Sequence, residues 1–210
     1  MKLQLIVTAA VVILPSSSRD LPSITLRVVN EAQVDYRLLK EAQRETAGIL
    51  HHVGVGLIWM DCSENRTNPQ RCQSGRGRAD FWFRVTTERP AWTSQENLGF
   101  TENAGGNGSG GVYYPAVVKL TEQLNGHARG IAPVAAYVPA FLGAAIAHEI
   151  GHLILGAHAH HAEGVMLAER GQEEFELIKL GGLNFARFQA KSLQIEVNRR
   201  VSEGGSVYRP

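Results

Sequence analysis

Hydrophobic and polar positions alternate along the chain with two periods, and the change from one period to the other predicts strands and helices. Runs rich in β-forming residues at 24–29, 55–60 and 81–85 predict three strands. The first run alternates in part with the period of two that is typical of strands, and the third alternates throughout. A run at 112–118, after a glycine-rich loop, predicts a fourth strand. Pro115 places this strand at a sheet edge, because a proline has no N–H group to donate to a neighbouring strand and is tolerated mainly at an edge.

Helical periodicity dominates elsewhere. Asp35 is a suitable cap for a helix that ends near His52, and the segment 137–156 is the longest apolar helix candidate. The segment 172–203 is rich in helical pattern, with a poorly defined middle. No internal repeat is visible. The order of elements predicts one α+β domain over residues 19–210, with strands mostly first and helices mostly last.

The first 18 residues have the outline of a secretory signal peptide. Lys2 precedes an almost unbroken apolar run from Leu3 to Pro15, and three serines follow it. A run of about 13 residues is shorter than the roughly 20 that span a bilayer as a helix. A buried first strand or a short membrane anchor is the alternative. We therefore expect a secreted or periplasmic protein without stable membrane insertion after cleavage.

Composition narrows the class of protein further. The 210 residues are 44% hydrophobic and 20% charged, which suits one globular domain with a sizeable core and not a mainly disordered chain. The formal net charge is only +1. A protein that binds nucleic acid through its phosphates normally has a clear basic excess, so we expect no nucleic-acid partner. The sequence does not indicate an oligomeric state.

The two cysteines, Cys62 and Cys72, lie close together in a polar stretch. In an exported protein they form a natural pair that closes a short loop. Two free thiols or half of a metal site are the other interpretations, although this spacing is not typical of zinc sites.

The segment His148-Glu149-Ile150-Gly151-His152 carries the most specific chemical signal. Two histidines four residues apart on a helix lie on one face, so both imidazoles can reach one Zn²⁺ ion. Glu149 is close enough to take a proton from a water without being a ligand. Apolar residues occupy the opposite face of this helix. An accidental match is the alternative, and the helical context argues against it.

A zinc site needs a further protein ligand, and three candidates follow directly: His158, His160 and His161. The remaining histidines are isolated and have the pattern of ordinary surface or core residues.

The motif at 148–152, the glycine at 156, the histidines after it and Gly164-Val165-Met166 together resemble the metzincin clan of zinc endopeptidases. The chain is most similar to uncharacterised secreted bacterial matrixin-like or adamalysin-like proteins. The resemblance implies a twisted mixed sheet with two long helices, the second being the active-site helix, and a C-terminal helical segment. It also implies that Met166 forms the floor beneath the metal, although an ordinary core methionine is the simpler interpretation. An edge strand, here expected at 112–118, would pair with extended substrate.

Counting alone does not assign the third ligand, because the clan's glycine is expected at position 155, where this chain has Leu155, and Gly156 follows. Counting along the clan's motif selects His158. Counting back from the methionine turn of the similar secreted proteins selects His160, four residues before Gly164. A helix that ends one residue later needs a longer return, which also favours His160, and we predict His160 with His158 as the alternative.

These residues predict a secreted zinc metalloendopeptidase that hydrolyses peptide or protein substrates, with Glu149 as general base. Two other functions stay open. One is a zinc-dependent hydrolase of a non-peptide substrate. The other is a catalytically silent secreted protein that binds zinc for stability, for which an intact Glu149 would be unnecessary.

Overall fold

The structure is a computed structural model that describes residues 21–63, 72–73, 77–91, 93–94, 96–104, 108–127 and 133–204. The expected signal peptide, residues 1–18, lies outside these residues. In chain order the elements are β1 (Ser23–Asn30), α1 (Tyr36–His52), β2 (Gly56–Asp61), β3 (Asp80–Thr86), β4 (Gly99–Glu102), β5 (Ser109–Tyr113), α3 (Tyr114–His127), the 3₁₀ turn η1 (Val134–Ala136), α4 (Val138–Leu155), α5 (Gln172–Lys179) and α6 (Arg187–Gly204).

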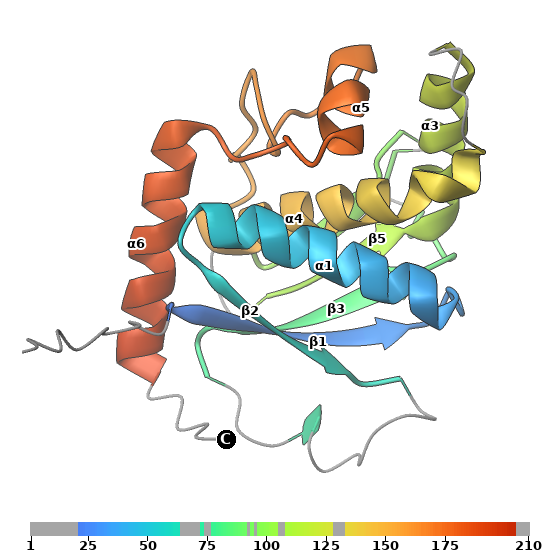
Figure 1. Cartoon of the computed structure of the whole chain (residues 1–210). Coiled ribbons are helices and arrows are strands. Elements are labelled where there is room, and N and C mark those ends of the chain that lie inside the picture. Colours follow the sequence, from blue (N-terminus) through green and yellow to red (C-terminus); the bar gives the residue numbers. More distant parts are fainter. Residues whose placement is uncertain are drawn as a thin grey trace, which may run out of the picture.

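The five strands form one mixed sheet in the order β2-β1-β3-β5-β4. The first four strands are parallel to their neighbours, and β4 is antiparallel to β5. The long helices α1 and α4 pack against each other on one face of this sheet (Figure 1). α6 is equally long, lies across one end of α4 and contacts β1. The α+β class, the mixed sheet and the C-terminal helical segment agree with the expectation from the sequence.

The two helices predicted most strongly form where the pattern placed them. Asp35 caps α1, since its carboxylate accepts hydrogen bonds from the backbone N–H groups of Arg37 and Leu38. α4 ends at Leu155, and Gly156 adopts a φ of 101°, a region that favours glycine, so the helix ends where the glycine pattern indicates.

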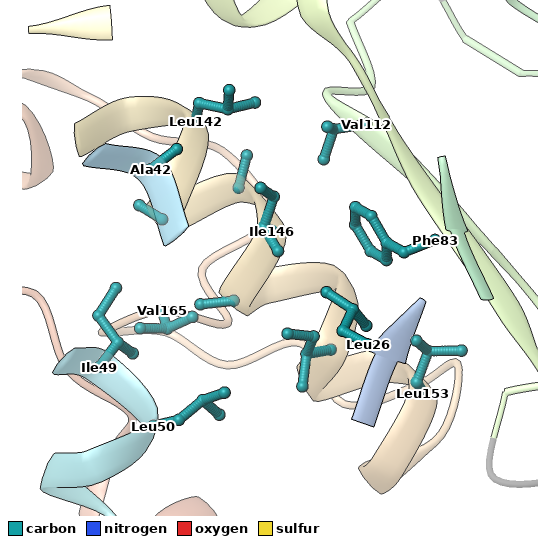
Figure 2. Packing of buried hydrophobic residues seen from close by; sticks show 14 of the residues in the cluster. Leu26, Ala42, Ile49, Leu50, Phe83, Val112, Leu142, Ile146, Leu153 and Val165 are labelled. Atoms are coloured by element: carbon teal, nitrogen blue, oxygen red, sulfur yellow. The ribbon is translucent and has the colours of Figure 1, made fainter. Parts of the chain in front are cut away.

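The hydrophobic core lies between the sheet and the helices (Figure 2). Leu26 of β1, Phe83 of β3 and Val112 of β5 point from the sheet toward α4. Ile146 and Leu153 of α4 meet them there, and all five side chains have zero exposure. Burial of this kind stabilises a fold by about 25 cal/mol per Å² of apolar surface removed from water.

The neighbouring residue of β1 alternates to the opposite side and is charged. Arg27 is 2% exposed and forms an ion pair with Asp80 of β3 at 2.8 Å. Its other terminal nitrogen donates to the carbonyl of Cys72 at 2.9 Å. Cys72 forms a disulfide with Cys62, with Cα atoms 5.9 Å apart. The disulfide and the buried ion pair therefore join the segment after β2 to the centre of the sheet.

The strand predicted at 112–118 is wrong in its second half. β5 ends at Tyr113, and α3 begins at Tyr114. Pro115 is therefore in the first turn of a helix, where its missing N–H would have had no partner in any case. The antiparallel edge of the sheet is β4, which the sequence pattern did not reveal, so the expected edge strand above the site is Gly99–Glu102.

Candidate metal centre

α4 carries the predicted motif and is buried on all sides. Nearly every residue from Val138 to Ile154 is buried, including His148, Glu149 and His152. The helix is long and apolar enough to cross a membrane, but 89% of it is buried inside the structure, which fits a core helix. The sequence predicted one core face and one chemical face; in the structure the chemical face is covered as well.

Three imidazoles meet at one point beside this helix. The Nε2 atom of His152 lies 3.1 Å from Nε2 of His148 and 3.1 Å from Nε2 of His160. One ring nitrogen from each of the three histidines lies within 4.8 Å of the others, an arrangement that could hold a metal ion. His158 is exposed and outside this group, and His161 packs edge-on against the ring of Phe188.

The hydrogen bonds of the two helical histidines direct their lone pairs into the cluster. Nδ1 of His148 donates to the carbonyl of Val165 at 2.8 Å, and Nδ1 of His152 donates to the carbonyl of Gly156 at 3.1 Å. A carbonyl oxygen only accepts, so the proton is on Nδ1 in each neutral ring and Nε2 presents a lone pair. Two lone pairs 3.1 Å apart repel each other unless a cation lies between them. The donor set therefore fits a metal ion such as Zn²⁺, for which neutral imidazole nitrogens are ordinary ligands.

Burial keeps these rings neutral. It lowers the pKa of His148 to about 2, with the positive charge of Arg170 as the next cause. Burial also lowers the pKa of His152, against the opposing effect of its hydrogen bond to Gly156. Neutral histidines are the form that binds metal.

A folded loop brings His160 back to the helix. The loop turns at Gly156, and Gly164, with a φ of 76°, lies so close to the backbone of residues 184–186 that a side chain would clash. The N–H of His161 donates to the carbonyl of Met166 at 3.0 Å, and Gln189 of α6 donates to the carbonyl of Ala159 at 2.7 Å. These two hydrogen bonds hold the loop on both sides of His160.

Met166 lies beneath the histidine-bearing helix. It has zero exposure, and a Cβ on Gly151 would overlap its sulfur and lie 3.1 Å from its methyl carbon. Gly151 therefore allows Met166 to approach the helix between the two histidines. The position agrees with the expected floor, and its packing agrees equally with a core methionine.

Glu149 is 6% exposed, and β4 packs against it. The hydroxyl of Thr101 donates to Oε2 at 2.9 Å, and a Cβ on Gly99 would lie 2.7 Å from Oε1. Burial raises the pKa of Glu149 to about 7, while the bond from Thr101 and the charge of Arg170 lower it. A carboxyl group with a pKa near neutrality can both accept and release a proton at physiological pH.

Thr101, Gly99 and Arg170 were missed by sequence reasoning. Arg170 is close enough to affect the pKa of both His148 and Glu149, and burial lowers its own pKa to about 10, so it stays charged at neutral pH. None of the three belongs to a motif. Only the pairing of β4 with β5 and the return of the loop after Met166 bring them to the helix.

Two solved structures share this arrangement of sheet and helices. One is a zinc-dependent peptidase from Methanocorpusculum labreanum, with a TM-score of 0.50, 13% identity and coverage of 80% of this chain and 99% of that chain. In fold, the chain resembles a zinc-dependent peptidase. The other is an archaemetzincin from Methanopyrus kandleri, with a TM-score of 0.50, 16% identity and coverage of 85% and 97%. The sequence matches no protein-family model and no curated protein.

The solved structures and the three-histidine cluster together support Zn²⁺ as the cofactor. The two solved structures are a zinc-dependent peptidase and an archaemetzincin, and they do not test the narrower resemblance to matrixin-like or adamalysin-like proteins.

Proposed function

We propose that this protein is a zinc-dependent endopeptidase with His148, His152 and His160 as metal ligands and Glu149 as general base. The observation that carries the proposal is the convergence of three histidine Nε2 atoms, two of them from the helix α4 that also carries the buried carboxyl group of Glu149. The shared fold with zinc-dependent peptidases supports peptides or proteins as the substrate class.

Bound zinc would supply Lewis-acid activation of a water molecule and of the peptide carbonyl. The residues of the chain supply the rest. Glu149 takes a proton from the attacking water and passes it to the leaving amine, which a pKa near 7 allows. Thr101 holds Oε2 in place by its hydrogen bond, and Val165 and Gly156 fix the orientation of the two helical imidazoles.

The test combines metal analysis with peptide cleavage. We expect about one zinc per chain and cleavage of a denatured protein or a peptide library that a chelator abolishes. Glu149→Gln should retain zinc and reduce kcat by about 10²- to 10⁴-fold, the usual contribution of a general base. Glu163→Gln, which changes an exposed carboxyl group in the return loop, is the matched control and should cleave normally.

Three results would reject the proposal or part of it. Cleavage by Glu149→Ala at the parent rate would remove Glu149 from the mechanism. Stoichiometric zinc with no cleavage of any peptide would favour the silent zinc-binding protein. Hydrolysis of esters or other small electrophiles, but not of peptides, would favour the non-peptide hydrolase.

Export is the second part of the proposal. The Cys62–Cys72 disulfide is compatible with an extracellular location. We propose that residues 1–18 are removed on export. Mass spectrometry of the exported protein should show a chain that begins near residue 19, and an intact Met1 in the mature protein would contradict this.

A further inference from the structure

A cavity of about 800 Å³ lies beside the candidate centre, within the size range of small-molecule and side-chain pockets. Three segments line it: the chain entering β4 with Leu98, the end of β5 and the start of α3 with Tyr113 and Lys119, and the segment after Met166 with Arg170. Its walls therefore combine apolar and aromatic surface with positive charge.

The cavity adjoins the groups proposed to carry out the reaction. Leu98 directly precedes Gly99, whose Cα faces the carboxyl group of Glu149. Nη2 of Arg170 donates at 3.3 Å to the carbonyl of Val165, and the same carbonyl accepts from Nδ1 of His148. A substrate with its scissile bond at the histidine cluster would therefore have a neighbouring group at this cavity.

Glu149 and Glu174 lie near enough to Arg170 to raise its pKa, but no residue that the structure describes forms an ion pair with it. Its Nε is shielded from solvent and has no hydrogen-bond partner in the described part of the chain. Nη2 makes only long bonds, of 3.3 and 3.4 Å, to two backbone carbonyls. A shielded guanidinium with incomplete hydrogen bonding is costly unless an anion pairs with it.

The other charged residues of the cavity do not supply that anion. Glu96 and Glu169 line it but are exposed, so water screens their charges. Arg89 is occupied by the carbonyls of Ser94 and Asn97 and lies over the ring of Tyr113. Among the arginines that line the cavity, Arg170 is therefore the one available to bind an anionic ligand.

We propose that this cavity receives a carboxylate of the substrate, next to the scissile bond, and that Arg170 pairs with it. The inference rests on the proposed function and specifies its substrate class. The carboxylate has two possible sources, the side chain of an aspartate or glutamate and the C-terminus of a peptide. Arg170 is then a specificity-determining residue, and Leu98 and Tyr113 contact the aliphatic part of the bound group.

The first experiment uses the zinc-loaded wild-type protein. A peptide library should show acidic residues, or a free C-terminus, enriched at one fixed position beside the cleaved bond. Matched peptides that differ only as glutamate and glutamine there should differ by about 10- to 100-fold in kcat/KM, the range for one charge-assisted hydrogen-bonded contact. A second pair, with a free and an amidated C-terminus, separates the two sources. Equal rates within both pairs would overturn the proposal.

The second experiment assigns the preference to Arg170. In Arg170→Met the ratio between the preferred charged peptide and its neutral partner should fall to about one. Lys119→Met removes an exposed cation from the same cavity and should keep most of the preference. An unchanged ratio in a folded Arg170→Met would show that this residue does not select the substrate. If that variant does not fold, the matched peptides on wild-type protein decide alone.

A binding assay distinguishes failure of this inference from failure of the proposed function. If wild-type protein cleaves no peptide, the same four peptides carrying a fluorescent label are tested for binding by anisotropy. Tighter binding of a charged peptide than of its neutral partner by about 10-fold would support the cavity as a carboxylate site. Equal binding would overturn it, whatever reaction the protein catalyses.

Discussion

Replacing His160 tests the most specific part of the metal site. The Nε2 atoms of His148 and His160 each lie 3.1 Å from that of His152. Zinc with Zn–N bonds of about 2.0–2.1 Å in a tetrahedral site holds its nitrogens about 3.3 Å apart. The two distances that involve His152 therefore need to change by only a few tenths of an ångström to suit one ion, and all three ligand atoms lie within 4.8 Å of one another, which makes His160 a full ligand in our proposal.

The expected loss of zinc affinity is obtained by dividing the free energy of zinc binding equally among the ligands. Structural zinc sites bind with roughly 10–16 kcal/mol from four ligands, so one ligand contributes about 2.5–4 kcal/mol, or about 70- to 900-fold in Kd. His160→Ala should lose that amount, whereas His158→Ala should change Kd by less than about threefold, because His158 is exposed and outside the cluster.

Competition with a chromophoric zinc chelator measures both constants, and circular dichroism confirms that each variant is folded. His160 is itself exposed, so its removal should cost little packing. If His158→Ala releases zinc while His160→Ala retains it, the proposed ligand set and the geometric reasoning behind it are both wrong.

Three further predictions concern the surroundings of the site. Thr101→Val removes the hydrogen bond that lowers the pKa of Glu149, so the acidic limb of the pH profile of kcat/KM should move to higher pH. Activity at pH 7 should fall about 10-fold. Thr101→Ser keeps a hydroxyl group and should leave the pH profile unchanged. Gly151→Ala pushes a methyl group into the buried Met166 and should lower the free energy of unfolding, measured by thermal denaturation, by about 1–3 kcal/mol. Gly48→Ala, whose added Cβ would have no atom within 4 Å, should leave the free energy of unfolding unchanged or raise it. His148 is neutral in the fold but titrates near 6.5 when unfolded, which lowers the unfolding free energy as the pH falls, whereas the raised pKa of Glu149 acts in the opposite direction. The metal-free Glu149→Gln variant lacks the second effect, so its unfolding free energy should fall by about 1.4 kcal/mol per pH unit below about 6.5 on account of His148, and flat urea midpoints of this variant between pH 7 and 5 would contradict this.

Much of the fold was predictable because its elements have strong local patterns. The strand β1 is rich in β-forming residues and alternates in part, and the helix α1 has both a capping aspartate and an apolar stripe. The error at 112–118 arose because a short apolar run with a proline suits an edge strand and a helix start equally well. β4 has four residues, two of them buried against distant parts of the chain, so its strand character is set by tertiary contacts.

The same distinction applies to the candidate site: some of its residues have a local sequence pattern, and the others are brought to it by tertiary contacts. The spacing of His148 and His152 within one helix is visible in the sequence, because three intervening residues place both rings on one face. The position of His160 depends on where the helix stops, and the late glycine indicated the longer return that the structure contains. Thr101 and Arg170 have no such signal, since each reaches the site through a different strand pairing or loop.

The placement of the three imidazoles also has a kinetic consequence. Two of them belong to a buried helix whose opening would require much of the core to unfold. The third is exposed and lies on a loop held by a few backbone hydrogen bonds. A bound ion would therefore leave through local opening of residues 156–166, and its residence time would follow the stability of that loop. Substitutions that loosen the loop, such as Gln189→Ala at its contact with Ala159, would shorten the residence time without changing any ligand.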